Sequence, residues 1–86
     1  MSGNPTEGQA ALMPENCPFC KQPTEFRNAG RGDIEMDCRN CLIEVTFARP
    51  AAAMECESPE RTLEYIRGLM LLGIKRPVVT SVDMRR

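Results

Sequence analysis

The chain is short, slightly acidic and poor in aromatic residues: it has 86 residues, 11 Lys and Arg against 12 Asp and Glu, three Phe, one Tyr and no His or Trp. This length allows one small domain, and so few aromatic residues provide little core to stabilise it unaided. The acidic balance disfavours sequence-independent nucleic-acid binding, and no apolar run approaches the roughly 20 residues that a membrane span needs.

Residues 1–16 contain two prolines, two glycines and no sustained hydrophobic periodicity. We expect them to form a flexible N-terminal arm. The alternative is a peptide that becomes ordered on a partner through Leu12 and Met13. The segment lacks the basic start and apolar run of a secretory signal.

Two cysteine pairs with C-x-x-C spacing follow the arm: Cys17 with Cys20, and Cys38 with Cys41. Each pair can direct two thiolates at one ion, and two such knuckles joined by a hairpin complete a tetrahedral site. We therefore predict that these four cysteines bind one structural Zn²⁺. Iron is compatible with the same ligands. Because no coordination position remains for a reacting water, we expect a protein that is not an enzyme.

Disulfide bonds are the competing use of these cysteines. The chain has five cysteines, an odd number, and no secretory signal, so we expect reduced thiols and a cytoplasmic location. A redox role for either C-x-x-C pair would need a surrounding βαβ pattern, which the sequence does not show. Four thiolates and one Zn²⁺ would bring the formal charge from −1 to about −3. Without metal, residues 17–49 should be largely unfolded.

Three segments between and after the knuckles predict strands. Residues 23–27 have a β-compatible centre, residues 28–33 supply a glycine-containing turn, and residues 34–38 and 43–47 alternate apolar and polar side chains. We expect a small α+β zinc ribbon at 17–49, a three-stranded antiparallel sheet with two Cys knuckles, plus one C-terminal amphipathic helix. The predicted core residues are Phe19, Phe26, Ile34, Met36, Ile43, Val45 and Phe47.

Residues 50–57 form a predicted linker that contains the fifth cysteine, Cys56. It lies between Glu55 and Glu57, and the chain offers no histidine that could act as its base. We interpret Cys56 as an ordinary half-buried thiol, with a nucleophile and an additional metal ligand as the alternatives.

Residues 58–73 predict the helix, with Ser58 as N-cap, Pro59 at the first helical position and Gly73 at the end. Its apolar arc covers roughly half the circumference, whereas a stripe of about 100° is enough to dock on one core. The surplus suggests a second contact surface, for a partner protein or a homodimer. The alternative is that the N-terminal arm or the C-terminal segment covers it. We assign partner binding to Tyr65, Ile66, Leu69 and Leu72.

Residues 74–86 carry basic side chains around the valine-rich stretch 78–82. We interpret this segment as an edge strand or as a basic tail that contacts nucleic acid or an acidic protein, and its composition slightly favours the strand. The candidate nucleic-acid contacts are Arg27, Arg31, Arg39, Lys75 and Arg76.

The Cys-Pro-Phe-Cys opening, the short strand pair, the Cys-x-x-Cys return and the following helix resemble the small Lar-type restriction-alleviation zinc ribbons of phages and prophages. The resemblance covers about residues 16–72. Lys21 and Leu42 replace the glycine that usually follows each knuckle, and the Trp-Asn pair typical near the end of the family's helix has no counterpart. The resemblance supports the four knuckle cysteines as zinc ligands and implies a phage-encoded protein that modulates a host restriction-modification system.

From these observations we expect a non-catalytic zinc-binding adaptor or modulator, encoded by a phage or prophage. It would engage a bacterial host protein, such as a restriction-modification or transcription component. The alternative is a zinc ribbon that binds nucleic acid through its arginine and lysine side chains.

Overall fold

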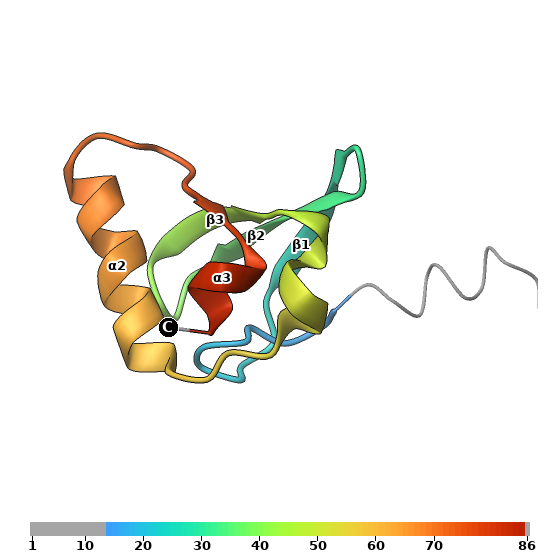
Figure 1. The fold of residues 1–86 in the computed structure, drawn as a ribbon, viewed down its shortest axis with the longest axis horizontal. Coiled ribbons are helices and arrows are strands. Elements are labelled where there is room, and N and C mark those ends of the chain that lie inside the picture. The colour runs from blue at the N-terminus through green and yellow to red at the C-terminus, as the bar shows by residue number, and fades with distance from the viewer. Residues whose placement is uncertain (1–13, 86) are drawn as a thin grey trace, which may run out of the picture.

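The computed structural model describes residues 14–85 (Figure 1). In chain order the elements are strands β1 Glu25–Gly30, β2 Asp33–Cys38 and β3 Ile43–Phe47, the 3₁₀-helix η1 Arg49–Met54, helix α2 Pro59–Leu71, strand β4 Val78–Val79 and helix α3 Ser81–Met84. Helix α2 lies inside the predicted range 58–73.

Most of the predicted N-terminal arm, residues 1–13, lies outside the described residues. The last part of that range belongs to the fold. The backbone N–H of Thr24 donates to the carbonyl of Glu15 over 3.1 Å, and Asn16 forms an isolated bridge with Pro23. The prediction that the arm extends to residue 16 is therefore wrong, because this pairing holds the chain just before the first knuckle.

One four-stranded sheet, in the order β1-β2-β3-β4, organises the structure. Strands β1, β2 and β3 are antiparallel, as predicted, with Met36 opposite Val45 and Cys38 opposite Ile43. The predicted strand count of three is wrong. Strand β4 pairs with β3 in parallel, because the chain returns to the sheet through α2, a crossover that places two strands in the same direction.

The inward side chains of β2 and β3 form the core, and the alternating pattern of the sequence is reflected in their burial. The predicted core residues are buried except Phe26, which is partly exposed. The rings of Phe19 and Phe47 pack with centroids 6.1 Å apart. Further elements complete the core with side chains that the strand pattern did not predict: Ala51, Ile66, Val79 and Met84.

The other face of the sheet is covered by ion pairs. Arg27 contacts the carboxylates of Glu35 at 3.0 Å and Asp37 at 2.8 Å. Arg76, which precedes β4, contacts Asp37 at 2.9 Å and Glu44 at 3.8 Å. Hydrogen bonds from Arg27 and then from Arg76 hold the pKa of Asp37 below its usual range. These pairs account for the acidic residues that alternate with the core residues of β2 and β3: Glu35, Asp37 and Glu44.

Helix α2 ends in a Schellman motif. The N–H of Gly73 donates to the carbonyl of Met70, and the N–H of Ile74 donates to the carbonyl of Leu69. Gly73 has a φ of 102°, a conformation that glycine adopts without steric cost. Ser58 occupies the N-cap position, as predicted, but its side chain makes no capping hydrogen bond. Among residues 14–85, no helix is long and apolar enough to span a membrane.

The C-terminal segment is folded into the domain. Strand β4 is only two residues long, and Thr80 and Asp83 then form a capping box that begins α3. Met84 is fully buried, and its carbonyl accepts a 2.9 Å hydrogen bond from the N–H of Glu57. The edge strand was predicted, but for residues 78–82 rather than two residues. The Thr-x-x-Asp spacing at residues 80–83 is a sequence signal for the start of α3, and the predicted strand overlooked it.

Candidate metal centre

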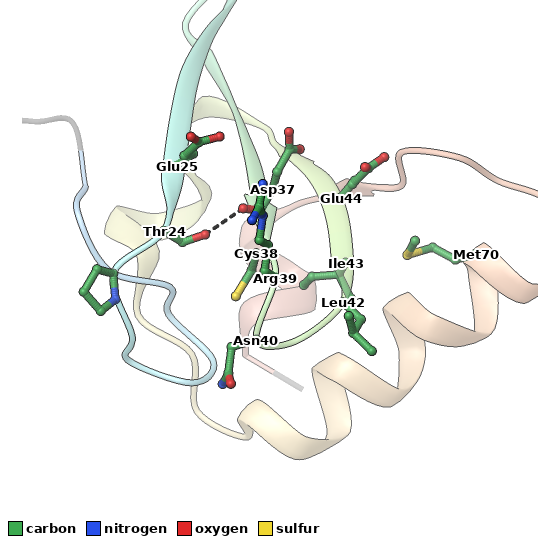
Figure 2. A pocket seen from close by; sticks show the side chains of 11 residues that line it. Thr24, Glu25, Asp37, Cys38, Arg39, Asn40, Leu42, Ile43, Glu44 and Met70 are labelled. Atoms are coloured by element: carbon green, nitrogen blue, oxygen red, sulfur yellow. Dashed lines mark hydrogen bonds between the residues drawn. The ribbon is translucent and has the colours of Figure 1, made fainter.

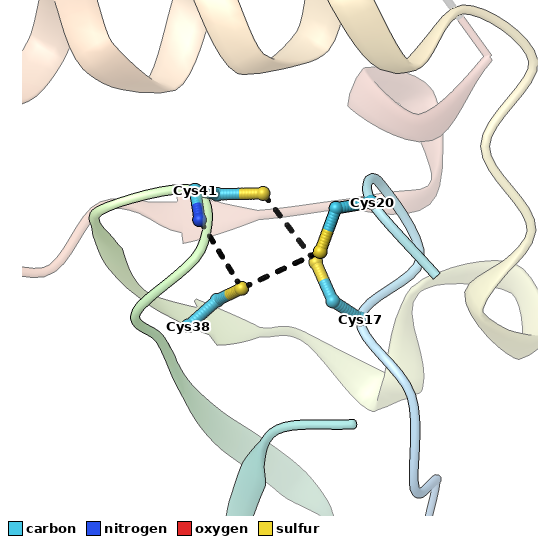
Figure 3. Close-up of side chains that lie close together, drawn as sticks. All are labelled: Cys17, Cys20, Cys38 and Cys41. Carbon is cyan, nitrogen blue, oxygen red and sulfur yellow. Dashed lines mark hydrogen bonds between the residues drawn. The ribbon is translucent and has the colours of Figure 1, made fainter. Parts of the chain in front are cut away.

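The four knuckle cysteines meet at one end of the sheet (Figure 3). Cys17 and Cys20 belong to the loop before β1, Cys38 is the last residue of β2, and Cys41 lies two residues before β3. Their Sγ atoms all lie within 4.8 Å of one another, and none of the cysteines is in a disulfide. The prediction that these four side chains form one candidate metal site is confirmed.

The sulfur spacing fits a tetrahedral metal centre. The Sγ atoms of Cys17 and Cys41 are 3.8 Å apart, and those of Cys20 and Cys38 are 3.7 Å apart. A tetrahedral ion with metal–sulfur bonds of about 2.3 Å would hold its sulfurs about 3.8 Å from one another. A disulfide would require about 2.05 Å. These two separations therefore fit a tetrahedral metal centre and exclude a disulfide within either pair.

Backbone hydrogen bonds shape both knuckles. In the first, the N–H of Lys21 donates to the carbonyl of Cys17 over 2.8 Å, and the N–H of Phe19 donates to the Cys17 Sγ over 3.4 Å. In the second, the N–H of Cys41 donates to the Cys38 Sγ, also over 3.4 Å. Such N–H···S contacts stabilise negative charge on sulfur, which a thiolate ligand carries.

The residue that follows each knuckle adopts a left-handed backbone conformation. Lys21 has a φ of 66° and Leu42 a φ of 61°. Cβ makes this region unfavourable by roughly 1–2 kcal/mol for residues other than glycine. Lys21 and Leu42 therefore keep the left-handed turn that glycine favours, although each carries a side chain.

Burial and hydrogen bonding act differently on the thiols. Burial raises the pKa of Cys17 to about 11 and also raises that of Cys41. Burial would raise the pKa of Cys20 as well, but hydrogen bonds from the backbone of Gln22 and the side chain of Asn40 lower it to about 7. The buried thiols Cys17 and Cys41 thus keep their protons at neutral pH until a cation replaces those protons.

Arg67 connects α2 to the second knuckle. Its Nη2 donates a 2.8 Å hydrogen bond to the carbonyl oxygen of Cys41. The guanidinium therefore fixes the helix against the second knuckle and places a positive charge next to a loop of the candidate metal site. Sequence reasoning missed this role of Arg67, because the contact between helix and knuckle is a tertiary feature without a local signal.

Cys56 lies outside the cysteine cluster, half-buried beside α2. Its Sγ is 3.3 Å from the Oγ1 of Thr62, which in turn donates to the carbonyl of Asp83 over 3.2 Å. This position agrees with the predicted half-buried thiol, and a packing role in the linker accounts for it.

The residues predicted to bind a partner differ in exposure. Ile66 is fully buried and belongs to the core, so its assignment to a contact surface is wrong. Tyr65 and Leu69 are partly buried. Leu72 is 80% exposed, and its neighbour Leu71, which was not assigned, is 88% exposed.

The predicted nucleic-acid contacts do not form one surface. Arg27 and Arg76 are held in ion pairs with carboxylates of the sheet. Arg31 lies in the turn that precedes β2, whereas Arg39 lies just after that strand, inside the second knuckle. Lys75 is exposed between α2 and β4. Arg31 and Arg39 thus lie at opposite ends of β2, whereas Arg27 and Arg76 meet at Asp37.

A cleft of about 720 Å³ lies beside the second knuckle (Figure 2). Leu42 and Ile43 on the knuckle side and Met70 on α2 contribute apolar walls, and Glu25, Asp37 and Glu44 contribute polar ones. Further exposed apolar side chains lie in the second knuckle and at the end of α2. We call the following four exposed side chains the apolar cluster: Leu42, Leu71, Leu72 and Ile74.

Comparison with known proteins gives no further assignment. No protein family, curated protein or solved structure matches the chain.

Proposed function

We propose that this chain is a non-catalytic zinc-binding adaptor, in which one structural Zn²⁺ fixes the knuckles and the end of α2 binds a partner protein. The observation that carries the proposal is a set of four sulfur donors within 4.8 Å of one another, two pairs of which have tetrahedral spacing. Four protein ligands leave no open position at which a metal could activate water. The centre therefore acts on stability and shape.

Zinc is the proposed metal because a closed site of four thiolates matches its ligand and geometry preferences. The free energy of zinc binding also agrees with a structural role for this metal. The apparent binding free energy of structural zinc is about 10–16 kcal/mol, which exceeds the net stability of a typical small domain. Iron in the same four-cysteine site is distinguished by mass and by its visible absorption.

The apolar cluster is the proposed contact surface. Leu71 and Leu72 are 88% and 80% exposed, and Leu42, across the cleft from α2, is 77% exposed. Exposed apolar side chains that gather at one place are typical of protein interaction sites. Arg67 fixes this end of the helix beside the second knuckle. The surface is therefore held by the metal centre.

The proposed partner is a bacterial host protein, and the resemblance to Lar-type chains favours a component of a restriction-modification system. The same resemblance supports a phage or prophage origin. Cytoplasmic location follows from a host partner and from cysteines that must stay reduced to bind metal. Nucleic-acid binding receives less support, because two of the five candidate side chains are already paired with carboxylates.

The test begins with native mass spectrometry of the purified chain, for which we expect one Zn²⁺ per chain. Binding to a purified host restriction-modification enzyme is then measured by biolayer interferometry. Leu72→Glu should weaken binding at least about tenfold while keeping its zinc, since a charge would be buried at the interface. Val82→Glu is the matched control, because Val82 is an exposed apolar residue, 68% accessible, on α3.

Three outcomes would contradict the proposal. Equal loss of binding in Leu72→Glu and Val82→Glu would show that the apolar cluster is not the contact surface. A dimer that Leu72→Glu converts to a monomer would assign this surface to self-association. Binding to a DNA duplex that weakens linearly in log[salt], without binding to the enzyme, would favour the nucleic-acid alternative.

A further inference from the structure

A second concavity, of about 650 Å³, lies at the end of β2 opposite the cysteine cluster. Strand β2 runs from Asp33 to Cys38, so its length separates the two sites by about 17 Å along the strand. The walls come from the β1–β2 turn, the start of η1 and both ends of α3, whose C-cap is Arg85. Their polar residues are Arg31, Asp33, Arg49, Thr80, Ser81 and Arg85. We call this concavity the arginine pocket.

Backbone hydrogen bonds hold the three wall segments together. The N–H of Arg49 donates to the Oδ1 of Asp33 over 3.0 Å, which ties the chain after β3 to the start of β2. The N–H of Ala48 donates over 2.9 Å to the carbonyl of Val79, a fully buried residue immediately before Thr80. The arginines thus come from three parts of the chain that the folded backbone fixes beside one another.

The charge of the pocket is not balanced within the described part of the chain. None of the four ion pairs found among residues 14–85 involves Arg31, Arg49 or Arg85. Asp33 is the single carboxylate on the walls, and that of Asp83 lies directly behind them, bonded to Thr80. Three guanidinium groups and these two carboxylates leave a net charge of about +1. This excess is local, since the chain as a whole is slightly acidic.

The two hydroxyl groups of the pocket, on Thr80 and Ser81, differ in their availability for a ligand. The Oγ1 of Thr80 is engaged in the capping box with Asp83, at 3.1 Å from its Oδ2. Ser81 lines the pocket next to Thr80 and offers one further neutral donor. The side-chain donors available for a ligand are therefore the three guanidinium groups and one hydroxyl.

We propose that the arginine pocket binds the phosphate monoester group of a small molecule. A monoester carries a charge of about −1.5 to −2 at neutral pH, opposite in sign to the excess charge of the walls. Guanidinium groups bind phosphate oxygens in pairs through their forked N–H donors. The walls include no aromatic side chain, so the pocket lacks the stacking surface on which nucleic-acid-binding proteins hold bases. This proposal does not depend on the adaptor function.

The test is an amide NMR titration of the zinc-loaded full chain with phenyl phosphate. We expect saturable shifts at Arg31, Asp33, Arg49 and Ser81, with a Kd of about 1 mM or below. Arg49→Gln removes one charge-assisted contact and should weaken binding at least about tenfold. Dimethyl phosphate, which carries one negative charge, should bind at least about tenfold more weakly than phenyl phosphate.

Arg39→Gln is the matched control, because Arg39 is an exposed arginine beyond the other end of β2. The affinity of the Arg39→Gln protein for phenyl phosphate should stay within about twofold of that of the unsubstituted protein. Each variant is accepted after it shows unchanged zinc content and a dispersed spectrum. Equal weakening by Arg39→Gln, or no saturable shift at about 20 mM ligand, would overturn the proposal. A DNA duplex that shifts the same amides at lower concentration would replace it with a nucleic-acid site.

Discussion

Glycine at position 42 should give a more stable protein than alanine at the same position. Leu42 has a φ of 61°, so an alanine there keeps the left-handed strain of roughly 1–2 kcal/mol while glycine removes it. Glycine also gives the unfolded chain more conformational freedom, which offsets about 0.4–1 kcal/mol of this gain in stability. Both variants lose the same exposed side chain. The Leu42→Gly protein should therefore exceed Leu42→Ala by about 1 kcal/mol in free energy of unfolding.

Urea denaturation at a fixed concentration of free zinc measures this difference, because zinc binding adds to the stability of the folded state. For a domain of this size, 1 kcal/mol also corresponds to a difference of about 4–8 °C in Tm. The control is the same pair of substitutions at Asn40, an exposed residue in the same knuckle that lacks a positive φ. There alanine should equal or exceed glycine in stability. If the Leu42→Ala protein is instead more stable than the Leu42→Gly protein, the left-handed backbone conformation assigned to Leu42 is refuted.

Three further predictions concern the metal, the core and the C-terminus. Cys38→Ser should abolish stoichiometric zinc binding in native mass spectra, whereas Cys56→Ser should retain one zinc; metal retention by the first variant would refute the ligand set. Ile66→Ala should destabilise the protein by about 2–5 kcal/mol in urea, because the side chain is fully buried, while Leu72→Ala should change stability by less than about 0.5 kcal/mol. Asp83→Ala should cost about 1 kcal/mol through loss of the capping box and accelerate amide exchange in α3; unchanged exchange would contradict that cap.

The metal site and the antiparallel strands could be predicted from sequence because their signals are local. C-x-x-C spacing nearly determines which sulfurs meet, and strict alternation determines which face of β2 and β3 is buried. The face of α2 was harder to assign. Its apolar arc is wider than one core requires, and the arc alone does not show that Ile66 faces the sheet while Leu71 faces solvent. That orientation depends on contacts such as the one from Arg67 to the second knuckle.

The C-terminal elements could be predicted only in part for a different reason. A valine-rich stretch indicates strand propensity, but it does not reveal a parallel partner or a length of two residues. The pairing with β3 requires a crossover through α2, and its end is determined by the capping box that begins α3. The arginine pocket had no sequence signal, because Arg31, Arg49 and Arg85 are far apart in the chain and meet only after β4 has joined the sheet.

The two proposed sites depend on the metal to different degrees. The apolar cluster relies on the second knuckle, since the Cys41 carbonyl that anchors Arg67 belongs to a residue whose sulfur faces the metal centre. Metal removal should release the end of α2 and the surface it presents. The Asp33–Arg49 and Ala48–Val79 hydrogen bonds hold the walls of the arginine pocket together. They involve no candidate metal ligand and lie at the far end of β2. Loss of zinc should affect the pocket only through unfolding of the sheet. One metal would therefore organise the proposed adaptor surface directly and the proposed anion site indirectly.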